Sequence, residues 1–417
     1  MREPVARSGR GRVYEGEAAP QARKRWSPHA GMRPRSSSRC AAIAMLAMLL
    51  SMVLGGSGTA AQRPEGSVGP AEELQRLLSV HGFAPPLREA ALDRAASALA
   101  ERLAGPPGDA PQEAATEHLA HLLSVERVSD AQVFPMTVRH RQFPDFSAHL
   151  PSLLGRLDRT KAPTHFGAST FVRNGALTTA VLLVHRGLVL EQPLPRTGEP
   201  GGYTRVRGQL ERGYFRPRVL VAPPNGARIR ERPAWSTDRS VDVTLHFAEG
   251  PGVYGIEVVA DSQYGPVVLN NHEVYVGVPA PDLAVLRLEP PASEAAPDAT
   301  LLRLVNEQRA ASGVAVLRVW PELTSVARDW STELAAQRVL VHATADAGTL
   351  TTRLVARGLR FTQAGENLAN ASTPRQALAA MLSSPGHKKN LLDPRWTHVG
   401  VGVSSRYYVL AFVRLAP

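Results

Sequence analysis

The residue types best suited to chemistry lie in the C-terminal part of the chain. His342 follows a run with helical periodicity, Gly365-Glu366-Asn367 comes next, and Ser384-Pro385-Gly386-His387 follows later. Imidazole and carboxylate groups can transfer protons, and they can also bind a metal ion. We therefore expect His342, Glu366 and His387 to meet in one cleft that serves either binding or catalysis.

Two predicted helices would position these side chains. Residues 322–341 are expected to form a helix whose core face carries Leu323, Ala327, Trp330 and Leu334. His342 would follow directly at the helix end, where the helix dipole favours a cation, so a simple helix cap is the alternative role. Residues 374–382 predict a shorter helix, and Ser384-Pro385-Gly386 would then present His387 on a constrained turn. Glu366 would lie on a tight turn permitted by Gly365, with a loop anchor as its alternative role.

These motifs resemble the CAP superfamily of cysteine-rich secretory, antigen 5 and pathogenesis-related proteins, over about Ala299 to Pro417. The Leu304–Arg309 run is similar to the first helix of the family, and Val399-Gly400-Val401-Gly402-Val403 is similar to a late strand. The bacterial branch without disulfides is the better match. The resemblance implies an α/β/α sandwich, and it makes His342, Glu366 and His387 the residues of the family's cleft.

Two positions depart from the family pattern. Met381 stands where the family usually has tryptophan, and Ser384 stands where the eukaryotic branch has a second glutamate. The four-residue set of histidines and glutamates is thereby reduced to three, which weakens a mechanism with two carboxylates. His398 could supply a third imidazole, although it leads into the predicted valine-rich strand.

A metal site is one possibility for this set. Catalytic zinc usually takes three protein ligands, and His342, His387 and Glu366 meet that count. No other cofactor is indicated. The part after residue 61 has no H-E-x-x-H helix, G-x-S-x-G turn, P-loop or dinucleotide fingerprint, which disfavours serine hydrolases and nucleotide enzymes.

The N-terminal residues 1–61 predict an export signal. A nearly uninterrupted apolar run from Cys40 to Gly56 follows three arginines, and small residues at Ala60 and Ala61 offer a cleavage site. Residues 1–31 are long for a leader, so translation is expected to start at Met32; a membrane anchor is the alternative reading of the apolar run. No span would remain after cleavage, and the protein would be secreted or periplasmic.

Charge and cysteine content fit this destination. Without residues 1–61 the chain keeps 38 basic and 34 acidic residues, so its net charge falls from +11 to +4. No basic run with interleaved aromatic residues remains, and we expect no nucleic-acid partner. Cys40, the only cysteine, lies in the leader. Stability must therefore come from core burial instead of disulfides.

The sequence predicts a multidomain protein. Residues 62–165 form a helical region, in which Thr164-His165-Phe166-Gly167 resembles Thr397-His398-Val399-Gly400; this region is either a decayed CAP-like repeat or similar by chance. Alternating apolar residues predict a mainly antiparallel β-sandwich over 166–278. A proline-rich linker over 279–299 leads to the CAP domain at 300–417.

The sequence is compatible with three functions. The first is a binding module for an envelope or extracellular ligand, such as a lipid. The second is a metal-assisted hydrolase that uses the same cleft. The third is a structural or adhesive protein in which the cleft is a relic. Fold alone does not decide among them.

Overall fold

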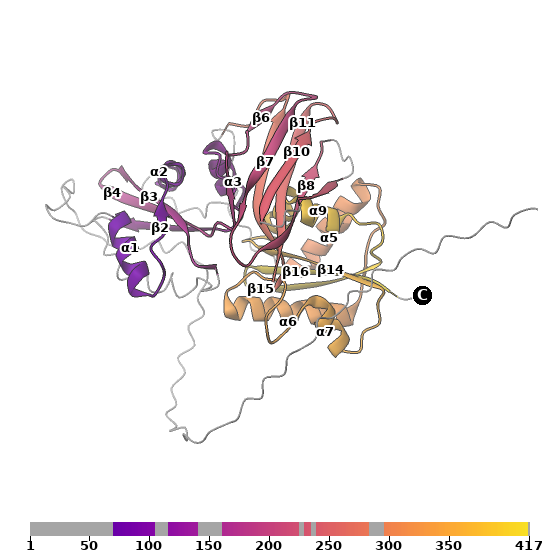
Figure 1. The fold of residues 1–417 in the computed structure, drawn as a ribbon. Helices are drawn as coiled ribbons and strands as arrows, with labels where there is room; N and C mark the ends of the chain where they lie inside the picture. Colours follow the sequence, from indigo (N-terminus) through magenta and orange to yellow (C-terminus); the bar gives the residue numbers. More distant parts are fainter. Residues whose placement is uncertain are drawn as a thin grey trace, which may run out of the picture. The chain divides into compact units, whose positions relative to one another are not determined.

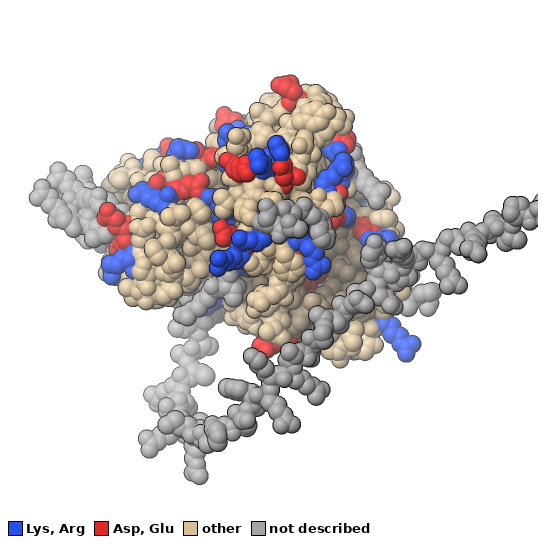
Figure 2. Space-filling view, viewed as in Figure 1, with Lys and Arg blue, Asp and Glu red and all other residues tan. Residues whose placement is uncertain are grey.

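The computed structural model describes residues 70–104, 116–140, 161–224, 229–234, 239–282 and 296–415. The expected signal segment and most of the predicted linker lie outside the described residues. None of the helices in the described ranges is long and apolar enough to cross a membrane. On the face shown in Figure 2, basic and acidic side chains are interspersed.

The C-terminal domain is built on a four-stranded sheet with the order β13-β15-β16-β14. Its strands are β13 (Arg318–Val319), β14 (Gln363–Asn370), β15 (His398–Ser404) and β16 (Tyr407–Arg414). Its helices are α5 (Pro297–Ala311), α6 (Pro321–Gln337), α7 (Leu350–Ala356), α8 (Pro374–Ser383) and α9 (Pro385–Leu391). In Figure 1, α6 and α7 lie on one side of this sheet, and α5 and α9 lie on the other.

Alternation along the strands builds a core on each face of this sheet. In β16, Tyr408, Leu410 and Phe412 pack with α5 and α8. The intervening Val409, Ala411 and Val413 pack with α6 and α7. Helices on both faces of one sheet confirm the α/β/α arrangement predicted for this domain.

The glycines of the Val399–Val403 run let α6 approach the sheet. A Cβ added to Gly400 would lie 2.3 Å from the backbone carbon of Leu323, and one added to Gly402 would lie 2.1 Å from the carbonyl oxygen of Ala327. The valines between them face the opposite core. The alternation of valine and glycine therefore reflects one packed face and one face in contact with helix backbone.

Two mainly antiparallel sheets precede this domain, and within them β6 pairs in parallel with β12. One has the order β10-β7-β5 and the other β6-β12-β11-β8-β9. The strands are β5 (Leu188–Leu190), β6 (Thr197–Gly198), β7 (Tyr203–Leu210), β8 (Phe215–Ala222), β9 (Arg230–Pro233), β10 (Ser240–His246), β11 (Gly252–Ser262) and β12 (Gly265–Val276). Side chains from both sheets share one hydrophobic core. We call strands β5–β12 the β domain.

The N-terminal part contains strands as well as helices, whereas the sequence predicted a helical region. It contains α1 (Pro70–Val80), α2 (Ala90–Leu103) and α3 (Thr116–Val125), together with β1 (Leu87–Arg88), β2 (Val133–His140), β3 (His165–Arg173) and β4 (Ala176–Val184). Strands β3 and β4 pair with β1 and β2 and not with the β domain. The β-sandwich therefore starts near residue 188, and the period-two pattern at 166 belongs to a different sheet.

The first and last sheets have the same topology. Their orders are β1-β3-β4-β2 and β13-β15-β16-β14, with a parallel first pair and antiparallel pairs thereafter. Local detail agrees as well. His165 pairs with Val184 as His398 pairs with Val413, and each histidine bonds the hydroxyl of the preceding threonine at 3.0 Å. A Cβ on Gly167 would meet the start of α2 at 2.2 Å, as one on Gly400 would meet α6.

Candidate functional site

His342 and Glu366 are in direct contact. Nδ1 of His342 donates to Oε2 of Glu366 over 2.9 Å, and Nη2 of Arg353 donates to Oε1 over 2.6 Å. The Glu366 side chain is only 4% exposed, against 29% for His342. Since an ionised carboxylate can only accept, this contact places the proton of a neutral His342 on Nδ1 and leaves Nε2 available to a ligand.

The arginine in this group is held on three sides. Arg353, on α7, donates from Nη1 to the carbonyl oxygens of His342 and Gly348 over 3.2 and 2.9 Å. Its guanidinium lies 3.9 Å from the ring centroid of Trp330 on α6. Arg353 thus balances the buried charge of Glu366 and also fixes the loop that carries His342.

Two sequence-based placements differ from the structure. Helix α6 ends at Gln337, with Arg338 in the left-handed conformation, so His342 lies in the following loop and does not cap the helix. Glu366 lies within strand β14, not on a turn. Gly365 is required there for close approach, because a Cβ would lie 2.8 Å from the ring of Trp396. The sequence correctly marked position 365 as one that needs glycine, but the cause is close packing against Trp396 and not a turn.

His387 occupies the first turn of α9, as the turn signal predicted. Ser384 is the N-cap and its hydroxyl accepts from the His387 N–H. The Asn367 side chain donates to the His387 carbonyl over 2.9 Å and accepts from Asn390 over 2.9 Å, which ties β14 to α9. Burial, and to a lesser degree the positive charge of His342, lowers the pKa of His387 to about 4. His387 is therefore a neutral imidazole at physiological pH.

One residue of this region was missed by the sequence reasoning. Glu257, on β11 of the β domain, is fully buried and reaches the turn before His387. Its Oε2 accepts from the Ser384 hydroxyl, and its Oε1 accepts from the Gly386 N–H over 3.0 Å. Burial raises the pKa of Glu257 to about 7, although both hydrogen bonds act in the opposite direction. No local motif marks Glu257, because its partners lie more than a hundred residues away in the chain.

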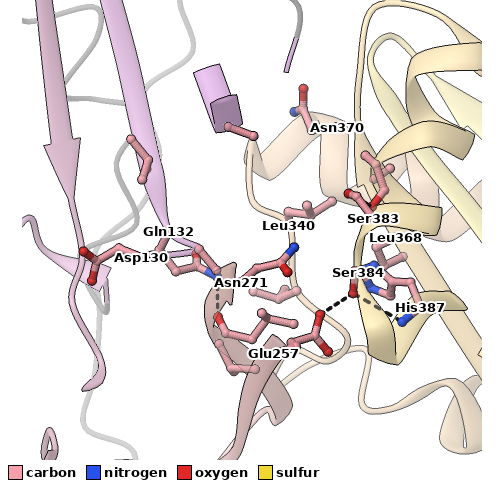
Figure 3. A pocket seen from close by; sticks show the side chains of 18 of the residues that line it. Asp130, Gln132, Glu257, Asn271, Leu340, Leu368, Asn370, Ser383, Ser384 and His387 are labelled. Atoms are coloured by element: carbon pink, nitrogen blue, oxygen red, sulfur yellow. Dashed lines mark hydrogen bonds between the residues drawn. The ribbon is translucent and has the colours of Figure 1, made fainter. Parts of the chain in front are cut away.

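His342, His387 and Glu257 line one cavity of about 450 Å³. Figure 3 shows Glu257, Ser384 and His387 side by side at one end, with Leu340 and Leu368 nearby. The apolar lining is contributed by all three parts of the chain and includes Leu119, Leu123, Val133, Val267, Leu340 and Leu368. Glu366 does not line the cavity but lies behind His342. His398 does not line it either, and its ring lies beside Trp320 at 6.5 Å between centroids.

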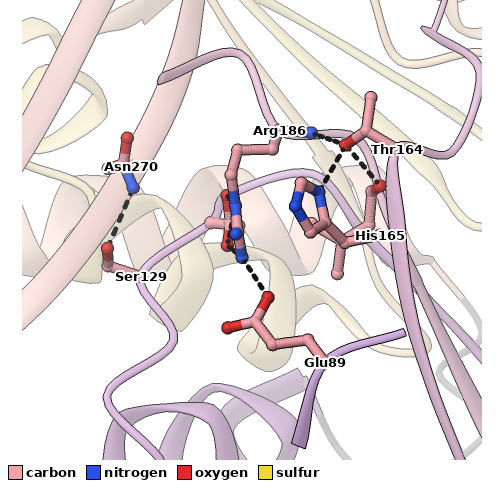
Figure 4. A network of polar contacts seen from close by, with 8 residues as sticks. Glu89, Ser129, Thr164, His165, Arg186 and Asn270 are labelled. Atoms are coloured by element: carbon pink, nitrogen blue, oxygen red, sulfur yellow. Dashed lines mark hydrogen bonds and ion pairs between the residues drawn. The ribbon is translucent and has the colours of Figure 1, made fainter. Parts of the chain in front are cut away.

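Two of the acidic groups in and around the cavity, Asp130 and Glu366, have arginine partners, whereas Glu257 is held by a hydroxyl and a backbone N–H. Asp130 also lines the cavity, and Arg186 holds it over 2.8 Å while contacting Glu89 over the same distance (Figure 4). Glu366 is matched by Arg353. A ligand in this cavity would therefore meet imidazole, hydroxyl and carboxyl groups at one end. Elsewhere the lining is mixed, with apolar side chains beside Gln132, Asn271 and Asn370.

The contacts of Glu366 do not suit a three-ligand zinc site. Both of its oxygens are engaged by protein cations or imidazole, so binding a metal would require breaking the pair with Arg353. In the part of the chain that the structure describes, no group of three or more His, Cys, Asp or Glu side chains could hold a metal ion. Zinc binding by His342, His387 and Glu366 remains a prediction, which these contacts disfavour.

Comparison with known sequences identifies the domain that carries the site. The sequence model of the cysteine-rich secretory protein family, CAP, matches residues 302–413. Residues 302–413 are a CAP domain. The protein named YkwD of Bacillus subtilis strain 168, uncharacterised, is 31% identical over 113 residues, which cover 27% of this chain and 44% of that protein. The uncharacterised membrane protein YlbC of the same strain is 36% identical over 116 residues, covering 27% of this chain and 33% of that protein. The chain thus spans less than half the length of either curated relative.

The solved structures that resemble this chain are more distant. An extracellular protein containing an SCP domain from Bacillus anthracis is 26% identical and covers 38% of this chain and 57% of its own, with a TM-score of 0.28. A cysteine-rich secretory protein from Staphylococcus aureus is 19% identical and covers 39% and 55%, with a TM-score of 0.27. The CAP assignment rests on the sequence matches.

Proposed function

We propose that this CAP-domain protein is exported and binds a small extracellular or envelope ligand in the cavity lined by His342 and His387. The observation that carries the proposal is that two imidazoles from separate elements line one cavity, with His342 oriented by Glu366. Orientation of a side chain before binding lowers the entropic cost of holding a ligand.

The surroundings favour an uncharged amphipathic ligand, such as a neutral lipid. The charges of Asp130 and Glu366 are balanced within the protein, and His387 is neutral at physiological pH. A polar head would hydrogen-bond the imidazoles, and a hydrocarbon body would cover the leucines and valines of the walls. Lys161 and Glu257 also line the cavity, so a charged head would need a contact with one of them to compensate its desolvation.

The geometry favours binding over hydrolysis. Glu366 is saturated by His342 and Arg353, and the Ser384 hydroxyl is engaged by Glu257 and the His387 N–H. Glu257 could act as a base toward the Ser384 hydroxyl, but this hydroxyl is also the N-cap of α9, so its attack on a substrate would break the cap.

The test is to extract the exported protein with organic solvent and identify what it carries by mass spectrometry. We expect one lipid class at close to one molecule per chain, and a loss of at least about tenfold in His342→Ala and in His387→Ala. His398→Ala is the matched control, because this histidine belongs to the same domain but not to the cavity. Ligand-free protein, or equal retention in all three variants, would refute the proposal.

We further propose that residues 70–184 are a second CAP-like unit that has lost its site. The shared strand order, pairing and glycine contacts support this origin. Pro135 pairs with Leu182 at the register position where Glu366 pairs with Ala411, so the carboxylate is absent. The unit keeps a role at the remaining site, because Leu119 and Val133 line the cavity.

A further inference from the structure

Glu257 is an unusual residue to find buried where it is. It belongs to the β domain, and the groups that act on it are the Ser384 hydroxyl and the Gly386 N–H of the CAP domain. It is 0% exposed, and none of the cationic side chains in the described ranges acts on it. A buried acid of this kind costs free energy that an apolar residue in the same place would not. Its presence therefore calls for a role other than cohesion between the two domains.

The contacts of Glu257 converge on the turn that presents His387. The Ser384 hydroxyl donates to the Glu257 carboxyl and accepts from the His387 N–H, so that a single hydroxyl links Glu257 to the cleft histidine. The backbone of Gly386 also approaches Glu257 closely, since a Cβ there would lie 2.6 Å from Oε1 of Glu257.

A second contact between the β domain and α9 provides a comparison. Lys389 forms an ion pair with Glu231 of β9 over 2.5 Å, but the two side chains are 49% and 37% exposed. Exposed pairs of this kind contribute little to stability, and this one does not involve the turn before His387. Glu257 and Glu231 therefore differ in two ways. Glu257 is buried and holds the turn before His387, whereas Glu231 is partly exposed and pairs with Lys389.

We propose that Glu257 is a positioning residue of the cleft, through which the β domain fixes the turn that presents His387 to the cavity. The β domain is then part of the binding site and not a spacer before it. The inference rests on the proposed function in taking His387 as a cleft residue. It assigns a role to a side chain that lies outside the CAP domain altogether.

The test uses the full chain without residues 1–61. Glu257→Asp keeps the charge but withdraws the carboxyl from Gly386 by one methylene, whereas Glu257→Gln keeps the length and an acceptor. Two readouts by mass spectrometry report on the turn: hydrogen exchange of the 384–392 peptide, and modification of the His387 ring by diethyl pyrocarbonate. We expect both to be about tenfold faster in Glu257→Asp and within about twofold of the parent in Glu257→Gln. Glu231→Ala, which removes the exposed contact, should leave both rates unchanged.

Several results would overturn the proposal. One is a Glu257→Asp protein with parent-like rates at His387, and another is an equal acceleration by Glu231→Ala. An acceleration at His398 as large as that at His387 would indicate general loosening and would also refute it. If Glu257→Asp does not fold, Ser384→Ala, which breaks the same link from the other side, is judged by the same rates. Because neither readout needs a ligand, failure here is distinct from failure to find a bound lipid.

Discussion

At the scale of single residues, the site is a chain of contacts that orients one imidazole. Arg353 neutralises Glu366, and Glu366 in turn orients His342. The sequence indicated the histidine and the glutamate, but not the arginine. Nothing in the spacing of Arg353 distinguishes it from the neighbouring Arg357, which is exposed and pairs with Asp329. Only the folded contacts separate a buried arginine from a surface one.

This difference predicts unequal effects of two similar substitutions. Arg353→Ala should lower the free energy of unfolding by about 3–5 kcal/mol, because it leaves the buried Glu366 carboxylate without its partner. Arg357→Ala, at the C-cap of the same helix, should cost less than about 1 kcal/mol. Urea unfolding of both variants measures the two values. Equal costs would contradict the assigned role of Arg353.

The raised pKa of Glu257 makes a prediction about pH. In the folded state this pKa is about 7, above the usual 4.5, so the folded protein binds the proton more tightly than the unfolded chain. The stability of the parent relative to Glu257→Gln should therefore fall as pH rises from about 5 to about 8, by up to about 3 kcal/mol. The lowered pKa of His387 acts in both proteins and largely cancels in this difference. Unfolding measured across that pH range provides the test, and a flat or rising difference would contradict it.

At the scale of elements, local patterns predicted the CAP domain well. Helices α6 and α8 and the turn before His387 were read from periodicity and capping residues. The N-terminal sheet was not, because β1 is two residues long and its pairing with β3 joins residues far apart in sequence. Glu257 was missed for the same reason, since its role depends on a partner in another domain.

The glycine contacts give a prediction at this scale. Gly400→Ala should destabilise the protein by about 1–3 kcal/mol, because the new methyl group would overlap the backbone of α6 and push the helix from the sheet. Gly167→Ala should have a similar cost through α2 if the two units share one architecture. Thermal unfolding measures both. Parent-like stability of Gly400→Ala would contradict the close approach of helix and strand.

At the scale of the whole molecule, the CAP domain has its own cores but shares its cavity. Two hydrophobic clusters, one on each face of its sheet, are made of residues 301–413. The cavity walls also come from α3 and the β11–β12 hairpin. Folding of the CAP domain therefore needs only its own two hydrophobic clusters, whereas the complete cavity needs residues from the other two parts of the chain as well.

A fragment of residues 297–417 should fold by itself for this reason. We expect a cooperative thermal transition, since both clusters are complete in the fragment. The fragment lacks Glu257, so its 384–392 segment should exchange hydrogen faster than in the full chain. A fragment without a cooperative transition would show that the other parts are needed for folding itself.

The most direct test of the account follows the histidine rings as a ligand enters. The full chain without residues 1–61, labelled at histidine, is titrated with decanol as a neutral amphipathic probe and observed by NMR. We predict that the ring signals of His342 and His387 shift together and saturate, while the signal of His398 does not move. Shifts at only one of the two cavity histidines, at neither, or equally at His398 would contradict the claim that His342 and His387 form one binding site.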